Sequence, residues 1–123
     1  MQLNIDTKEK FHLITLVNET SSATLTDETL ATLQSYLHNN VKNVVFNIAL
    51  LEEMDVSTAE QLVFIQQQFY EQGASFVICS LSKKIEAYLD SIGLLEVMNI
   101  TPTESEAYDI VQMEEIEREL LGD

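Results

Sequence analysis

The chain has 123 residues, of which 46% are hydrophobic, enough to bury roughly two-thirds of the unfolded surface around one core. It holds 21 acidic and six basic side chains, a formal charge of -15, which disfavours nucleic acid and anionic membrane as partners and favours a basic protein surface. The same charge also keeps an ordinary acidic domain soluble, so it identifies no partner by itself. Because three glycines and one proline leave no flexible linker, we expect a single domain over residues 1–123.

The first expected elements are two strands, Leu3–Ile5 and Phe11–Val17, which flank a polar stretch in the manner of a hairpin. An amphipathic helix should follow, with Thr26 or Asp27 as its N-cap. Its apolar residues recur at helical spacing: Leu30, Leu33 and Leu37.

Two short apolar runs, Val44–Ile48 and Ser75–Cys79, are separated by strong helix formers from Ala59 to Gln72. This pattern predicts two neighbouring parallel strands joined by a right-handed helical crossover that begins near Ser57. Cys79 is the one cysteine of the chain, so a disulfide within the chain is excluded and a buried strand position is expected for it.

Ser82 can cap a third helix that ends at Gly93, before a short strand over 97–100. Thr103 and Glu106 form a capping box that opens a final, acidic helix within 103–123. The residues expected on its inner side are Ala107, Ile110, Met113, Ile116 and Leu120. The predicted order β-β-α-β-α-β-α-β-α is an α/β fold with a mixed central sheet and about four helices.

Catalytic and metal-binding patterns are missing from the sequence. His12 and His38 have no Cys or His partner at ligand spacing, and the three glycines are too far apart for a phosphate loop. The acidic run 114–119 is best interpreted as a solvated helix face. We therefore expect no enzyme activity, no cofactor and no metal. Without a basic-apolar leader or a run of about 20 apolar residues, we also expect a cytoplasmic protein that does not enter the membrane.

The junction between the strand 44–48 and the next helix reads Met54-Asp55-Val56-Ser57-Thr58. It resembles the Met-Asp-Ser-Ser-Gly motif of STAS domains in the anti-sigma factor antagonist family. The resemblance continues through 41–48 and 76–82, which look like the family's strands. It reaches 89–94, which looks like the family's Phe-Asp-x-Ser-Gly-Leu helix end, and it covers roughly residues 11–112.

The resemblance implies a bacterial signalling protein that regulates transcription through protein–protein interaction. Its partner would be a serine-kinase anti-sigma factor, whose binding releases a sigma factor, and a PP2C-type phosphatase would reverse the modification. The implied phosphoacceptor is Ser57, with Thr58 as the alternative. The partner-binding surface would comprise Asp55, Val56, Ser57, Thr58 and, from helical spacing, Phe64.

The junction and a preceding loop depart from the family pattern at three places. Val56 stands where the family has Ser, Thr58 stands where it has Gly, and Asn18–Ser21 replaces Gly-Glu-Leu-Asp. The altered loop and Thr58 favour a second interpretation, a STAS subunit that is not phosphorylated and serves as an adaptor in a transport or sensory complex, whereas Asp55 and Ser57 favour the switch.

Two residues of this region keep alternative interpretations. Ser57 and Glu60 fit a capping box, so the serine hydroxyl can cap the helix as well as accept a phosphate. Phe64 belongs to the outer face, which also carries Glu60, Gln67, Gln68 and Glu71, while Ala59, Leu62, Ile65 and Phe69 face the sheet. Phe64 is therefore either an interface residue or peripheral core packed against a neighbouring helix.

Overall fold

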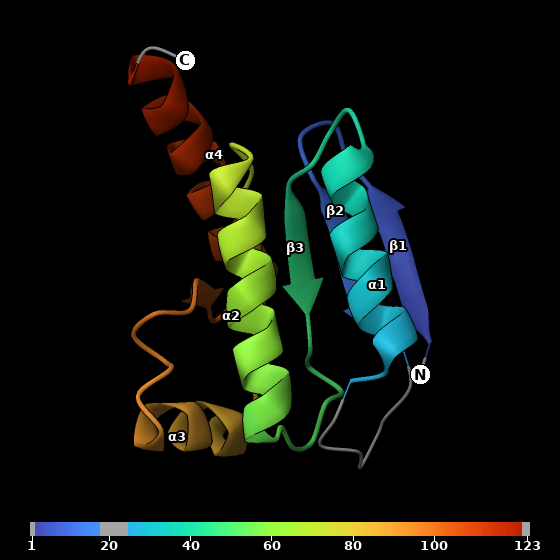
Figure 1. The fold of residues 1–123 in the computed structure, drawn as a ribbon, viewed down its shortest axis with the longest axis vertical. Coiled ribbons are helices and arrows are strands. Elements are labelled where there is room, and N and C mark those ends of the chain that lie inside the picture. The colour runs from blue at the N-terminus through green and yellow to red at the C-terminus, as the bar shows by residue number, and fades with distance from the viewer. Residues whose placement is uncertain (1, 18–24, 122–123) are drawn as a thin grey trace.

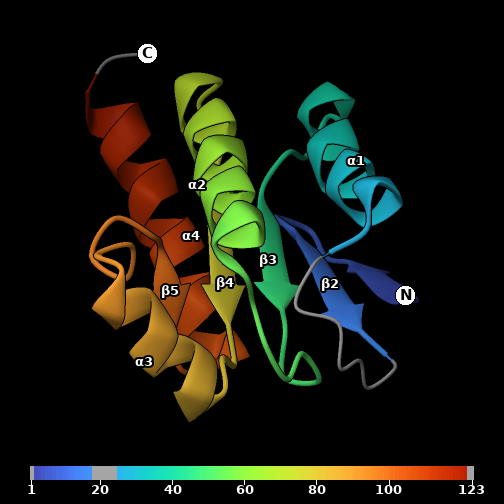
Figure 2. The same ribbon diagram turned by 60° about the horizontal axis from the view of Figure 1, so that its bottom comes forward.

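The computed structural model describes residues 2–17 and 25–121. Within them, a five-stranded sheet has the spatial order β1-β2-β3-β4-β5, and Figure 2 shows β2 to β5 side by side. β1 pairs antiparallel with β2, and every later pair is parallel. The strand bounds are Leu3–Thr7 for β1, His12–Leu16 for β2, Val44–Asn47 for β3, Phe76–Cys79 for β4 and Ile100–Thr101 for β5.

Helices cover both faces of this sheet. Their bounds are Asp27–Ser35 for α1, which continues into the 3₁₀ turn Tyr36–His38, Val56–Glu71 for α2, Lys83–Ser91 for α3 and Glu104–Leu120 for α4. α1 and α2 lie side by side over one face, α3 closes the end of that layer, and α4 lies on the opposite face (Figures 1 and 2). The predicted α/β class and mixed sheet are confirmed.

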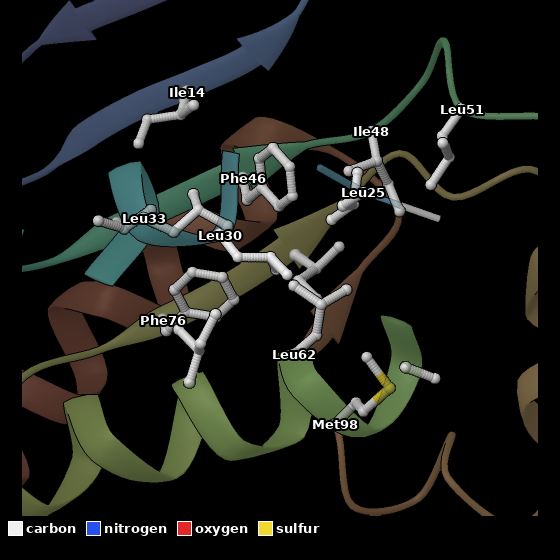
Figure 3. Close-up of a cluster of buried hydrophobic side chains, with 14 of the residues drawn as sticks. Ile14, Leu25, Leu30, Leu33, Phe46, Ile48, Leu51, Leu62, Phe76 and Met98 are labelled. Carbon is white, nitrogen blue, oxygen red and sulfur yellow. The ribbon is translucent and has the colours of Figure 1, made fainter. Parts of the chain in front are cut away.

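Alternation along the central strands divides the core into two clusters. Phe46 and Phe76 point towards α1 and α2 in the larger cluster, together with Leu33 and Leu62 (Figure 3). Ile78 belongs to the same cluster. The intervening residues point the other way and pack against α4: Val45, Val77 and Cys79 contact the cluster that holds Ala107 and Val111. Since both faces are buried, the buried positions of the two strands have to be apolar, as Val44 to Phe46 in β3 and Phe76 to Cys79 in β4 are.

The predicted crossover is confirmed, because β3 and β4 are parallel neighbours with Val44 opposite Phe76, and α2 connects them. The hairpin of β1 and β2 is also confirmed. The predicted N-caps of α1, α3 and α4 are confirmed, because the side chains of Thr26, Ser82 and Thr103 each accept a hydrogen bond from the amide three residues later.

Two predictions near the C-terminus are wrong. The strand expected over 97–100 lies instead at Ile100–Thr101, because the amides of Val97 and Met98 both donate to the carbonyl of Leu94 and form a turn. In α4, the expected inner residues Met113, Ile116 and Leu120 are exposed. Steps of three residues fall about 60° short of a full turn, so the predicted series rotates away from the sheet.

Candidate functional site

The candidate site is the corner where α2 begins, and Asp55 forms its N-cap. Asp55 has an extended backbone (φ -93°, ψ 168°), and its carboxylate accepts a hydrogen bond from the amide of Thr58. That bond measures 2.8 Å, and the Asp55 carbonyl accepts a second bond from the amide of Ala59 at 3.1 Å. The first bond satisfies an amide that the first helical turn would otherwise leave without a partner, and the second is the first regular bond of the helix.

The capping role predicted for Ser57 is therefore wrong, because the helix begins two residues earlier than the Ser57–Glu60 pattern suggested. With Asp55 as the cap, Met54 is buried before the helix, and Thr58 and Ala59 both point into the core. Ser57 falls in the first turn and is exposed. The cap lies at Asp55 because this helix start allows Met54, Thr58 and Ala59 to be buried together.

The two hydroxyl residues of the corner have opposite surroundings. Ser57 is exposed, whereas Thr58 is 0% exposed. The Thr58 hydroxyl accepts a hydrogen bond of 3.3 Å from the amide of Leu25, which precedes α1. No local sequence pattern predicts this bond, because the partners are 33 positions apart. It joins the entrance of α1 to the first turn of α2.

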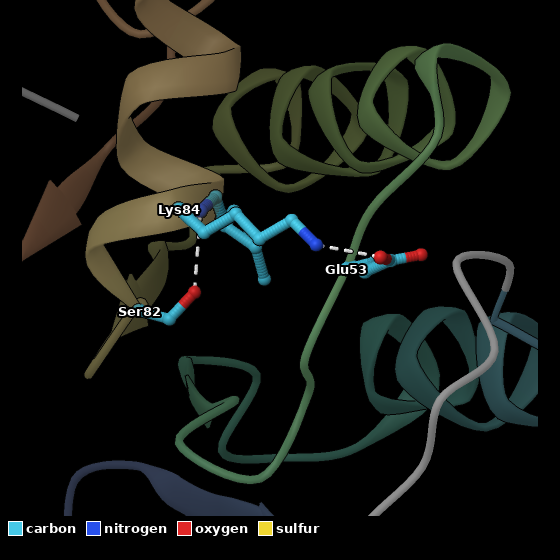
Figure 4. Close-up of polar contacts among 4 residues, drawn as sticks. Glu53, Ser82 and Lys84 are labelled. Carbon is cyan, nitrogen blue, oxygen red and sulfur yellow. Dashed lines mark hydrogen bonds and ion pairs between the residues drawn. The ribbon is translucent and has the colours of Figure 1, made fainter.

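An ion pair lies beside the corner and connects it with α3. The Lys84 ammonium lies 2.6 Å from a carboxylate oxygen of Glu53 (Figure 4). Its hydrogen bond and its charge hold the pKa of Glu53 below the ordinary value. Ser82 caps α3 by accepting a bond from the amide of Ile85 in the same view. A hollow of about 210 Å³ between the corner and α3 is lined by Glu53, Met54, Asp55, Lys84, Ile85 and Tyr88.

Phe64 lies on the outer face of α2 and is 58% exposed. The alternative in which it packs as peripheral core against a neighbouring helix is therefore wrong. The predicted inner face is confirmed, since Ala59, Leu62, Ile65 and Phe69 are all buried. Seven residues are close to two helical turns, so Phe64 and Ser57 share one side of α2. On that side Gln34 of α1 donates a 2.8 Å hydrogen bond to Gln68.

The described residues contain no cluster of three or more His, Cys, Asp or Glu side chains that would suit a metal ion. His12 is buried in β2, and its Nε2 lies 2.7 Å from the carbonyl of Val41. Burial raises the pKa of the Cys79 thiol to about 11, so this cysteine is a poor nucleophile at neutral pH. Over residues 2–17 and 25–121, the helices are too short or too polar to cross a bilayer. The departure noted at Asn18–Ser21 lies outside the described residues.

Comparison with known proteins gives a consistent picture of the fold. The family model of the STAS domain matches residues 4–107. An anti-sigma factor antagonist from Mycobacterium paratuberculosis is similar with a TM-score of 0.73 and 11% identity, over 90% of this chain and 93% of that one. RsbS from Moorella thermoacetica, in a serine-to-glutamate variant, is similar with a TM-score of 0.66 and 19% identity, over 91% and 96%.

The phosphorylated form of SpoIIAA, a Bacillus cell fate determinant, is similar with a TM-score of 0.61 and 17% identity, covering 89% of this chain and 99% of that one. At these identities the likeness concerns the fold. Among curated proteins, none matches the sequence.

Proposed function

The chain belongs to the STAS domain family, and from this premise we propose that it acts as an anti-sigma factor antagonist. In this proposal the start of α2 binds a serine-kinase anti-sigma factor, and phosphorylation of Ser57 ends the binding. The observation that carries the proposal is an exposed serine in the first turn of α2, at the position where the family motif has its phosphoacceptor.

The surroundings of the two hydroxyls favour Ser57 over Thr58 as the acceptor. A kinase needs the hydroxyl in its own active site, and the Ser57 side chain is on the surface. Thr58 would have to leave the core and give up its bond with the Leu25 amide. Of the similar structures, SpoIIAA has been solved in both unphosphorylated and phosphorylated forms, so a protein with this fold keeps the fold when it is phosphorylated.

A phosphate on Ser57 would act through charge. It adds about -1.5 to -2 charges close to Asp55, which caps the same helix, and to Glu60 on the next turn. The amide dipoles of the first turn would favour an anion at this end of the helix. Because Asp55, and not Ser57, holds the cap, the modification can leave the helix start intact and change mainly the surface that a partner must cover.

Phe64 extends the proposed binding surface along α2. It is a large apolar side chain that is more than half exposed. It lies among glutamines and glutamates, on a face where an aromatic side chain does not improve solubility. Aromatic residues in such settings are common binding hot spots. Its position two turns from Ser57, on the same side, lies within the footprint of one partner.

The remaining expectations from the family belong to this proposal. The protein would bind its partner in the cytoplasm, would catalyse no reaction itself, and would be returned to its active form by a PP2C-type phosphatase. The second candidate function, a non-phosphorylated adaptor in a transport or sensory complex, is favoured by one observation. Thr58 stands where the family has Gly, and its bond with Leu25 fixes the corner in one arrangement.

Affinity capture from the native cell extract separates the two functions. Wild-type protein should capture a protein with a kinase-like ATPase domain. Phe64→Ala and Ser57→Asp should each reduce that capture, while the control Val97→Ala, also at an exposed apolar residue, should not. Capture of a transport or sensory complex that is unaffected by Ser57→Asp would instead establish the adaptor.

A further inference from the structure

The C-terminal helix α4 has a second apolar face that its own fold does not bury. We define the α4 stripe as Met113, Ile116 and Leu120, whose exposed fractions are 55%, 55% and 81%. After Val111 no described residue of α4 is fully buried, and the last turns of the helix reach past the end of the sheet (Figure 1). Leu121, which follows the helix, is 80% exposed.

The stripe points away from the sheet. Ala107 and Val111 fix the buried side of α4. At about 100° per residue, the three stripe residues fall on the opposite side of the helix. Arg118 confirms this orientation, because its guanidinium reaches inward and donates a 3.3 Å hydrogen bond to the Ser75 hydroxyl. It is the one basic residue of α4, so no cation of this helix lies on the stripe.

Carboxylates border the stripe. Glu117 lies on one side of it and Glu119 on the other, Asp109 continues it one turn earlier, and all three residues are exposed. Seven of the 17 residues of α4 are acidic. The outer surface of the helix therefore combines an apolar centre with negative edges.

We propose that the α4 stripe is a docking face for a cationic amphipathic helix of another protein. The stripe residues recur at i, i+3 and i+7, the spacing with which one helix packs against another. Basic side chains on the edges of the incoming helix would pair with Glu117 and Glu119, and its apolar face would cover Ile116 and Leu120. A second copy of this chain is a poor occupant, because it brings the same carboxylates to the contact and doubles a charge of -15.

This surface is independent of the proposed switch. α4 and α2 lie on opposite faces of the sheet (Figures 1 and 2), and the stripe points away from that sheet. A partner on α4 and an anti-sigma factor at the start of α2 can therefore bind at the same time. Phosphorylation of Ser57 should leave binding at the stripe unchanged.

The test measures fluorescence anisotropy of a labelled model peptide, an amphipathic helix of about 18 Leu and Lys residues, long enough to be helical on binding. The full chain should bind it, and Ile116→Ser with Leu120→Ser should weaken binding about tenfold or more. Val97→Ser, which removes an equally exposed apolar side chain from another site, should change the affinity less than about twofold. A peptide with Glu in place of Lys should not bind.

Equal affinity of the double variant and the wild type would overturn the proposal, as would absence of peptide binding. Two further measurements test the other occupants. In sedimentation of the chain alone, a dimer that the double variant abolishes would assign the stripe to a second copy. In co-sedimentation with phosphatidylcholine vesicles, stripe-dependent binding would assign it to a lipid surface. Both variants should keep the wild-type melting temperature, because the replaced side chains are on the surface.

Discussion

Three residues at the start of α2 have different environments: Asp55 caps the helix, Ser57 is exposed and Thr58 packs in the core. Asp55 accepts the Thr58 amide, Ser57 stays at the surface, and Thr58 binds the Leu25 amide in the core. A serine with no structural task can be modified without unfolding the corner. The division also means that stability and switching can be measured by different substitutions.

Substitution of Asp55 should therefore remove the helix cap and lower stability, whereas substitution of Ser57 should not. Asp55→Ala should lower the free energy of unfolding by about 1 kcal/mol, because the Thr58 amide loses its acceptor. Ser57→Ala should change it by less than about 0.5 kcal/mol, as for other exposed positions. Urea unfolding of both variants checks this, with Asp55→Asn as the control that keeps an acceptor. A larger loss in Ser57→Ala than in Asp55→Ala would contradict the assignment of the cap.

Cys79 provides a pH-dependent test of the core. Burial, with a smaller contribution from the Glu104 charge, raises its pKa to about 11, against the opposing hydrogen bond with Ser80. At pH 8 about one thiol in a thousand is then ionised in the folded protein. At pH 8 an iodoacetamide probe should label Cys79 after denaturation but not in the folded protein, where the thiol is buried and protonated. Labelling of the folded protein should begin only as the pH approaches 11. Rapid labelling of native protein at pH 8 would mean that the α4 side of β4 is open.

The sequence predicts the strand–helix junction and the exposure of Val56 and Ser57. It wrongly places Thr58 on the binding surface, since that side chain is buried, and it does not identify the cap. Both Asp55 with Thr58 and Ser57 with Glu60 fit capping patterns at a spacing of three residues. The choice depends on which start buries Met54, Thr58 and Ala59, and that is a property of the folded core. The bond between Leu25 and Thr58 was equally inaccessible, because local patterns carry no information on contacts between distant segments.

Among the elements, α2 offers a comparison between two phenylalanines with opposite environments. Phe69 is 0% exposed and contacts Phe76 with a ring centroid distance of 5.2 Å, whereas Phe64 is 58% exposed. Phe69→Ala should cost about 3 to 5 kcal/mol of stability. Phe64→Ala should cost less than about 1 kcal/mol while it weakens binding of the captured partner by about 1 to 3 kcal/mol. Thermal unfolding and calorimetric titration separate the two effects, and a strongly destabilised Phe64→Ala would remove this residue from the binding surface.

The end of α3 depends on a glycine in the left-handed conformation. Gly93 has φ +76°, and a Cβ placed on it meets no atom within 4 Å. Gly93→Ala should therefore lose about 1 kcal/mol through backbone strain alone. Gly93→Asn should lose less, since asparagine tolerates this conformation. Chemical denaturation measures both, and equal losses for the two variants would point to a cause other than φ.

The sequence predicts the position of each helix, but it assigns the wrong buried face to part of α4. In α4 the apolar residues form two faces, and periodicity alone assigned Met113, Ile116 and Leu120 to the inside together with Ala107. The structure buries only the side set by Ala107 and Val111. A local pattern shows that residues share a face of a helix, but the sheet decides which face is covered. β5 was misplaced for a related reason, since the turn at Leu94–Met98 is defined by backbone bonds.

For the molecule as a whole, the sheet separates two surfaces. The larger core lies under α1 and α2, and the smaller one lies under α4. The central order was predictable because β3 and β4 are apolar on both faces and are joined by one helix. The proposed switch lies on one side of this sheet and the α4 stripe on the other, so the two proposed partners would not compete for one surface.

The measurement that tests the central claim most directly is phosphate incorporation from ATP by the captured kinase, with the site mapped by mass spectrometry. We expect one phosphate, on Ser57, that is absent from Ser57→Ala and unchanged in Thr58→Ser, which keeps a hydroxyl for the Leu25 amide. We also expect the phosphorylated chain to lose the kinase from a preformed complex. Undiminished incorporation into Ser57→Ala, or a phosphorylated chain that still holds the kinase, would contradict the proposed switch.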